Sequence, residues 1–274
     1  MRTRRGLRAT GNHLFASGTG LIILAPIYLV FVNALKTRSE ASSMGVGLPA
    51  NPQWQNFSTV IEEGKLLGAF ANSLLYSFGA TALCVILSAL AAYVLARRRT
   101  RGHQVIYLLL IMGIAMPTNF VTLTAVMQWT HLINTQIGII LLYAATQIPF
   151  SVFLIYAFMQ TVPRELDEAA LIDGCTPLRA FVRVIFPVLT PVLVTLAVLS
   201  ILNIWNEFLM PLYFLNRSDA WPMTLAVYNF FGQFQSDWSL VSADVVLTIL
   251  PVILIYIVAQ RWILSGMASG AVKG

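Results

Sequence analysis

The chain has 274 residues, of which 58% are hydrophobic and only 10% are charged, and its mean hydropathy is +0.77. A water-soluble domain carries about 25% charged residues, so this composition excludes a soluble globular protein and predicts a membrane protein. The net charge of +6 could suggest nucleic acid as a partner. The positions of the basic residues argue for a membrane topology instead, and no nucleic-acid binding is expected.

Six apolar runs are long enough to cross a bilayer, which takes about 20 predominantly apolar residues. The sequence therefore predicts an all-α membrane protein with six transmembrane helices, in which residues 1–13 precede a single transmembrane domain over 14–274. The six expected spans cover approximately residues 14–35, 70–96, 104–127, 137–159, 188–212 and 240–264.

The basic residues predict the orientation of these spans. Thirteen of the 17 Lys and Arg residues lie in the N-terminal segment, after the second and fourth spans, or from Arg261 to the end of the chain. Cytoplasmic loops are enriched in Lys and Arg, so both termini and the tail 265–274 are expected in the cytoplasm. The four basic residues on the opposite side are Lys36, Arg38, Lys65 and Arg217.

The largest loops on the expected outer side cover residues 36–69 and 213–239. The second loop contains an aromatic stretch from Tyr228 to Phe234, and aromatic residues are enriched at membrane interfaces. This stretch is interpreted either as an interfacial anchor or as a surface that touches an external partner.

The second span carries small residues at a spacing of four. Ala80, Cys84, Ser88 and Ala92 follow one another along a single helix face. Small residues allow another helix to approach closely, so this stripe predicts a packing face.

Polar residues interrupt the fifth span. Asn203, Asn206 and Glu207 are three or four positions apart and are expected to share one helix face. Facing lipid they would be costly, so they are expected to face a bundle interior or an aqueous path. Three interpretations stay open: a lining for a translocated solute, hydrogen bonding between helices, or a span end that already lies at the membrane interface.

The segment 160–187, which we call the hook, has the chemistry of two short helices. Acidic residues from Glu165 to Glu168 favour a helix N-terminus, and Gly174 suits the left-handed residue that ends a helix. Thr176 and Pro177 then suit the N-cap and first position of a second helix. Such short helices are unstable alone, so the hook predicts either docking in a partner's groove or a solvated loop. Small residues (Ala169 and Ala170) and apolar anchors (Leu166 and Leu171) lie in the middle of the first helix.

The hook resembles the EAA loop of ABC importer permeases. The resemblance rests on Glu168-Ala169-Ala170-x-x-Asp173-Gly174, followed by Ile185-Phe186-Pro187. The chain departs from the usual pattern at Phe186, where Leu is usual, and at Cys175, where Ala is common. Neither position belongs to the core of the motif.

Further elements resemble the carbohydrate-uptake, maltose-type group of these permeases, and specifically its shorter permease partner. They are Asn33-Ala-Leu-Lys36, Asn72-Ser73-Leu74, Trp205-Asn206-Glu207-Phe208, and the tail from Gln260-Arg261 to Gly270-Ala-Val-Lys-Gly274.

The resemblance implies a type I ABC importer permease in a bacterial or archaeal cytoplasmic membrane, surrounded by lipid, that imports a sugar or oligosaccharide by alternating access. It implies a second permease, two ATP-binding subunits and an extracytoplasmic solute-binding protein as partners. The residues that would couple to the ATPase are Glu168, Ala169, Ala170, Asp173 and Gly174. The chain has no phosphate-binding loop, so ATP and Mg²⁺ would be used by the partner subunits. No catalytic residue, metal ligand or bound cofactor is expected.

There are three alternatives to a sugar importer permease. A permease of the same fold could carry a non-sugar solute such as a glycerol phosphate or a polyamine. A membrane-embedded enzyme would need clustered carboxylates or metal ligands at a membrane face, and the clustered acids of the hook are explained as helix-start residues. A self-contained secondary carrier would be expected to show internal repeats, and no convincing repeat is present.

Overall fold

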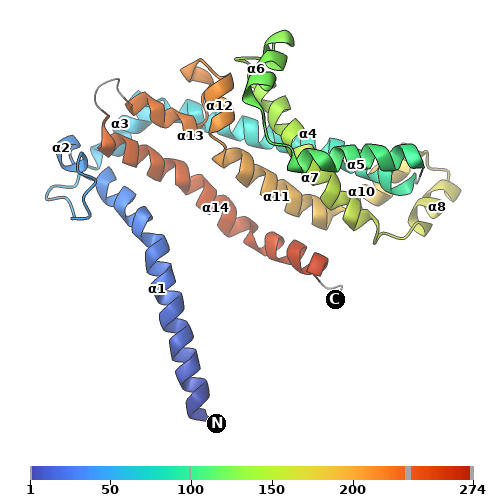
Figure 1. Cartoon of the computed structure of the whole chain (residues 1–274), viewed down its shortest axis with the longest axis horizontal. Coiled ribbons are helices and arrows are strands. Elements are labelled where there is room, and N and C mark those ends of the chain that lie inside the picture. Colours follow the sequence, from blue (N-terminus) through green and yellow to red (C-terminus); the bar gives the residue numbers. More distant parts are fainter. Residues whose placement is uncertain (1, 99, 232–235, 272–274) are drawn as a thin grey trace. The chain divides into compact units, whose positions relative to one another are not determined.

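The computed structural model describes residues 2–98, 100–231 and 236–271, and within these ranges it describes side chains from residue 17 to residue 260. The described residues are almost entirely helical, and an isolated bridge between Phe231 and Ser236 is the only β pairing among them. This confirms the predicted all-α class (Figure 1). The expected N-terminal segment 1–13 and tail 265–274 lie outside the residues whose side chains are described.

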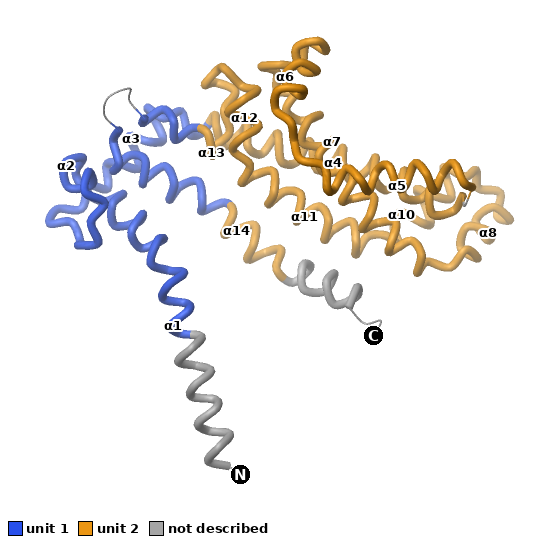
Figure 2. Tube along the Cα trace, in the orientation of Figure 1, with its two compact units in different colours: residues 1–67, 226–251 blue, residues 68–225, 252–274 orange. Residues whose placement is uncertain are grey.

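The chain divides into two compact units, residues 1–67 with 226–251 and residues 68–225 with 252–274 (Figure 2). The helices of the first unit are α1 (Arg2–Ala34), α2 (Arg38–Ala41), α3 (Gln55–Glu63), the 3₁₀ turn Val227–Phe230 and the first part of α14 (Trp238–Ala271).

The end of α1 is held by polar side chains of the first unit. Lys36 is buried, and its ammonium donates 3.1 Å to the Asn33 side-chain oxygen and also to the Gly45 carbonyl. The Asn56 amide donates to the carbonyls of Ala34 and Lys36, at 2.8 and 2.9 Å. The Asn33-to-Lys36 element therefore ends α1 and holds the loop that follows it.

The second unit begins within α4 (Leu66–Arg97) and contains the hook and the longest series of helices. In chain order these are α5 (Arg101–Ala115), α6 (Phe120–Trp129), α7 (Gln136–Met159), α8 (Glu165–Ile172), α9 (Pro177–Ala180), the π-helix η1 (Phe181–Ile185), α10 (Phe186–Val188), α11 (Thr190–Asn206), α12 (Leu209–Phe214), the 3₁₀ turn Ser218–Ala220 and α13 (Met223–Ala226).

Four described helices are long and apolar enough to cross a membrane, and the number rises to six if each of two bent pairs is one span. The four helices cover Ser17–Ala34, Leu66–Arg97, Gln136–Met159 and Trp238–Gln260. The bent pairs are Arg101–Ala115 with Phe120–Trp129, at 119°, and Pro177–Val188 with Thr190–Asn206, at 75°.

The expected span over 104–127 is therefore not a continuous helix. Pro117 lies in the break between α5 and α6, where it removes a backbone donor and holds the preceding Met116 in an extended conformation (ψ 120°). Asn119 then starts α6, because its side chain accepts 3.1 Å from the Thr122 amide.

The small-residue stripe of α4 is a packing face, as predicted. Ala80, Cys84, Ser88 and Ala92 are each 0% exposed. The Cys84 sulfur lies 3.2 Å from the Ser151 hydroxyl of α7, so the two helices approach closely at this point. A hydrophobic core of the second unit joins α4 and α7 with η1 and α11. The hook is therefore attached to the unit through buried apolar side chains.

Candidate functional site

The first helix of the hook ends in a hydrogen-bonded glycine motif. Gly174 has φ +79°, its amide donates 3.1 Å to Leu171, and the Cys175 amide donates 2.9 Å to Ala170. This pair of bonds is the Schellman arrangement, which satisfies the last carbonyls of a helix and favours glycine at the left-handed position. The left-handed backbone conformation at the end of this helix therefore explains the glycine that the sequence predicted there.

The second part of the hook begins at Thr176 and continues without a loop into the fifth apolar run. The Thr176 hydroxyl accepts 3.4 Å from the Arg179 amide, and Pro177 occupies the first helical turn. The chain then passes through η1 and α10 and bends before α11. π-Helical turns occur often at functional sites, and η1 lies within the hook, before the bend that leads into α11.

The five hook residues singled out in the sequence do not share one environment. Glu168, Ala169, Asp173 and Gly174 are exposed, whereas Ala170 is buried against the protein's own helices. Leu166 is half-buried and packs on the core of the unit, so only part of its side chain is accessible to a partner. Leu171 remains available for that role, because it is 51% exposed.

Sequence reasoning missed three further apolar side chains of the hook. Ile172, Leu178 and Val182 are 86%, 64% and 54% exposed. With Leu171, they give the hook four exposed apolar side chains besides its exposed acidic residues. Each is an ordinary apolar residue in an amphipathic segment, so only the folded arrangement shows that it turns outward.

Glu207 acts as a helix cap at the break between α11 and α12. Its carboxylate accepts hydrogen bonds from the amides of Leu209 and Met210, at 3.0 and 2.8 Å, and from the Tyr143 hydroxyl at 3.4 Å. A carboxylate at a helix N-terminus satisfies orphan donors and favours the positive end of the helix dipole. The polar residue in the apolar run thus has a structural partner for each carboxylate oxygen.

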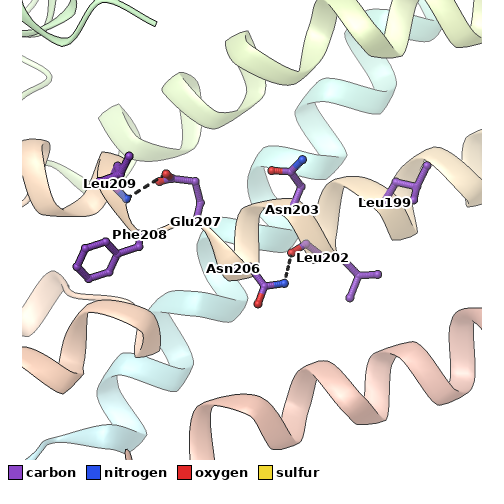
Figure 3. Close-up of a pocket in the computed structure, with 7 residues that line it drawn as sticks. All are labelled: Leu199, Leu202, Asn203, Asn206, Glu207, Phe208 and Leu209. Atoms are coloured by element: carbon purple, nitrogen blue, oxygen red, sulfur yellow. Dashed lines mark hydrogen bonds between the residues drawn. The ribbon is translucent and has the colours of Figure 1, made fainter. Parts of the chain in front are cut away.

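Asn203, Asn206 and Glu207 all line a pocket of about 620 Å³ in the second unit, as Figure 3 shows. The Asn206 amide donates 2.7 Å to the Leu202 carbonyl, one turn earlier in α11. Asn203 and Glu207 project to one side of the α11 ribbon and Asn206 to the other (Figure 3), so the three do not share one helix face as the sequence predicted. The remaining lining residues are Leu199, Leu202, Phe208 and Leu209.

Asn203 also lines a second pocket of about 960 Å³, which lies at the α5–α6 break and against α7. Asn119, Thr146 and Gln147 contribute further polar groups there. Asn203 therefore borders both of these pockets. Among the described residues, no group of three or more His, Cys, Asp or Glu side chains could hold a metal ion.

Comparison with known proteins finds relatives among transport system permeases. The chain is 32% identical to the probable starch degradation products transport system permease protein AmyC of Thermoanaerobacterium thermosulfurigenes, over 92% of this chain and 93% of that protein. It is 33% identical to the melibiose/raffinose/stachyose import permease protein MelC of Bacillus subtilis, over 91% of each.

A solved structure shows the same fold. One chain of a bacterial ABC transporter involved in the import of alginate superposes with a TM-score of 0.82, at 20% identity, over 95% of this chain and 98% of that chain. This confirms the ABC importer permease fold that the hook motif predicted.

The family model for binding-protein-dependent transport system inner membrane components matches residues 84–269, which include the hook and both pockets. This match confirms the prediction of a multi-pass inner-membrane transport subunit and not an enzyme. The chain belongs to the family of binding-protein-dependent transport system inner membrane components.

Proposed function

We propose that this chain is one of two permease subunits of an ATP-driven importer that carries a neutral sugar or oligosaccharide into the cytoplasm, with both of its termini in the cytoplasm. Relatives at 32–33% identity are named for starch degradation products, for melibiose, raffinose and stachyose, and for diacetylchitobiose. The observation that carries the proposal is the hook, whose exposed acidic and apolar side chains are presented on a helix closed by Gly174.

The hook is proposed as the contact with an ATP-binding subunit. Glu168, Asp173 and Gly174 would supply the polar edge of this contact, and Leu171 and Ile172 would supply the apolar surface. Removing exposed apolar side chains from water favours protein–protein association. Ala169 is small and exposed, which lets a partner approach the helix backbone, whereas Ala170 would fix α8 to this chain from the inside.

The remaining partners follow from the same proposal. The complex would contain a second permease, two ATP-binding subunits that use ATP and Mg²⁺, and an extracytoplasmic solute-binding protein, while this chain itself binds no cofactor. A related fold, with a TM-score of 0.57 and 14% identity, comes from an alginate ABC transporter in complex with an alginate pentasaccharide-bound periplasmic protein. That complex supports the idea that a loaded binding protein delivers the solute.

The pockets favour a neutral solute over a charged one. The described lining residues of both pockets include amides and hydroxyls, which can donate to and accept from sugar hydroxyls. They include no Lys or Arg that would bind a phosphate. The single acid, Glu207, already accepts three hydrogen bonds within the chain, which argues against a polyamine. Asn203 and Asn206 are proposed to line the path, and Glu207 to hold the helix break beside it.

Uptake by cells that lack this chain and are complemented with it tests the proposal. The solutes whose uptake is measured are radiolabelled maltotriose, raffinose and diacetylchitobiose, with glycerol 3-phosphate and spermidine as non-sugar solutes. We expect uptake of at least one oligosaccharide to depend on this chain and to be lost in Glu168→Gln, with the chain still present in the membrane. The proposal would be overturned if only a non-sugar solute were taken up. It would also be overturned if uptake and subunit co-purification were unchanged in Glu168→Gln.

A further inference from the structure

An ion pair connects the last residue of α4 to the first helix of the hook. The Arg97 guanidinium lies 2.7 Å from the Asp167 carboxylate, and the two side chains are only 16% and 13% exposed. Arg97 also donates 3.2 Å to the Val162 carbonyl, just before the hook helix begins. The charge-assisted pair is therefore sheltered from solvent, where ion pairs are screened less than at a surface.

Tyr93, one turn before Arg97 on α4, completes the connection. Its hydroxyl donates 2.8 Å to the second oxygen of Asp167, so both carboxylate oxygens are engaged. Its ring packs on Phe181, the first residue of η1, with 5.1 Å between ring centroids. Tyr93 thus contacts both halves of the hook from a single position on α4.

Asp167 and Glu168 are neighbours in sequence but lie in different environments. Asp167 is turned toward α4, whereas Glu168 is exposed on the side proposed to contact the ATPase. An isolated helix of eight residues does not hold its shape or direction in water. The contacts of Asp167, together with the packing of Leu166 and Ala170, therefore hold the exposed face of α8 in position.

The opposite end of α4 is bound to another segment of the same unit. Asn72 donates to the carbonyls of Asp219 and Trp221, at 2.8 and 3.1 Å, and the Ser73 hydroxyl accepts 2.9 Å from the Met223 amide. The helix between Asn72 and Arg97 is about 38 Å long at 1.5 Å per residue. α4 therefore connects the loop 219–223, at one of its ends, with the hook at the other.

We propose that Arg97, Tyr93 and Asp167 form a joint that makes α8 and α4 move as one body, so that displacement of the hook by the ATP-binding subunits is passed to α4. These are positioning residues, because they act through the exposed face of α8 and do not themselves contact the ATPase. The inference rests on the proposed role of the hook. It adds that coupling depends on three residues outside the Glu168–Gly174 motif, two of which lie about 70 positions before it.

The test uses the assembled transporter with its own partner subunits and binding protein, reconstituted in vesicles, and measures solute uptake per ATP hydrolysed. We expect Arg97→Ala and Asp167→Ala each to lower this ratio roughly five- to tenfold, at the low end of known coupling factors, while ATP hydrolysis persists. Because the two side chains act as a unit, the double variant should lose no more than either single variant. Arg98→Ala removes the exposed neighbouring charge and serves as the matched control.

Hydrogen exchange gives a second readout that does not depend on transport. Amides of residues 165–173 should exchange faster in both single variants and remain unchanged in Arg98→Ala. If Arg97→Ala fails to assemble, Tyr93→Phe keeps the ring on Phe181, removes only the hydroxyl, and should lower the uptake ratio in the same direction. An unchanged ratio in an assembled Asp167→Ala transporter, with uptake still lost in Glu168→Gln, would refute the joint and leave the proposed function intact.

Discussion

The Tyr76 hydroxyl of α4 donates a 2.7 Å hydrogen bond to the Ala220 carbonyl, 144 residues later in the chain. Asn72, on the same helix face one turn earlier, donates to the carbonyls on either side of Ala220 and accepts 3.0 Å from the Gln136 amide. The Asn-Ser-Leu element at the start of the second span therefore holds a distant loop through hydrogen bonds. Without Tyr76, the Ala220 carbonyl would be buried without a partner, which is costly.

Asn72→Ala should destabilise the chain, because it leaves two loop carbonyls and the Gln136 amide without their partner. We expect a loss of about 1–3 kcal/mol, the cost of leaving a buried hydrogen-bonding group unsatisfied. Thermal unfolding of the purified protein in detergent measures it. Asn216→Ala, which changes an exposed asparagine in a neighbouring turn, should leave the unfolding temperature unchanged. Equal unfolding temperatures for the two variants would show that the hydrogen bonds of Asn72 do not stabilise the chain.

Gly174→Ala should impair the hook through its backbone alone. An added Cβ at this position meets nothing within 4 Å, but φ is +79°, and a left-handed residue costs roughly 1–2 kcal/mol for an L-amino acid. Asn tolerates this conformation better than Ala. Uptake should therefore fall in the order Gly, Asn, Ala, with similar amounts of each variant in the membrane on immunoblots. If Asn proved worse than Ala, crowding against a partner subunit would be the better explanation.

Glu207→Gln should retain most activity, whereas Glu207→Ala should not. Glutamine keeps one side-chain oxygen, which can accept from the Leu209 or the Met210 amide, while alanine removes both acceptors at the start of α12, a loss worth about 0.5–2 kcal/mol. Uptake rate and thermal unfolding of the two variants check this. A substrate contact that needs the negative charge would instead make the glutamine variant as inactive as the alanine variant, with normal stability.

Lys36→Met should loosen the loop between α1 and α3. The buried ammonium holds the Asn33 side chain and the Gly45 carbonyl, and methionine keeps the apolar stem but removes these donors. We expect faster proteolytic cleavage between residues 37 and 54, measured by limited proteolysis and mass spectrometry. Glu62→Gln alters an exposed charge in the same unit and should leave the cleavage rate unchanged. Equal rates for both variants would show that the loop does not depend on Lys36.

The sequence predicted most where a structure depends on neighbours in the chain. The cap and stop of the hook, at Thr176 and Gly174, follow from backbone chemistry within four or five residues. The small-residue face of α4 follows from helical periodicity. Expectations were weaker where a proline or a polar residue could be accommodated in more than one way. The break at Pro117 divides the expected third span, and Glu207 caps a new helix where the fifth span was expected to continue.

By itself, the sequence determined that this is a helical membrane protein with a hook of the importer-permease type, because composition, apolar runs and capping residues are local properties. Only the tertiary structure decided that Ala170 and Leu166 face inward, and that Asp167 pairs with Arg97 and Tyr93. It also decided that Asn72 and Tyr76 hold residues 219–221. These pairs are separated by about 70 to 150 residues, and helical periodicity specifies which face a side chain lies on but not which distant segment meets that face.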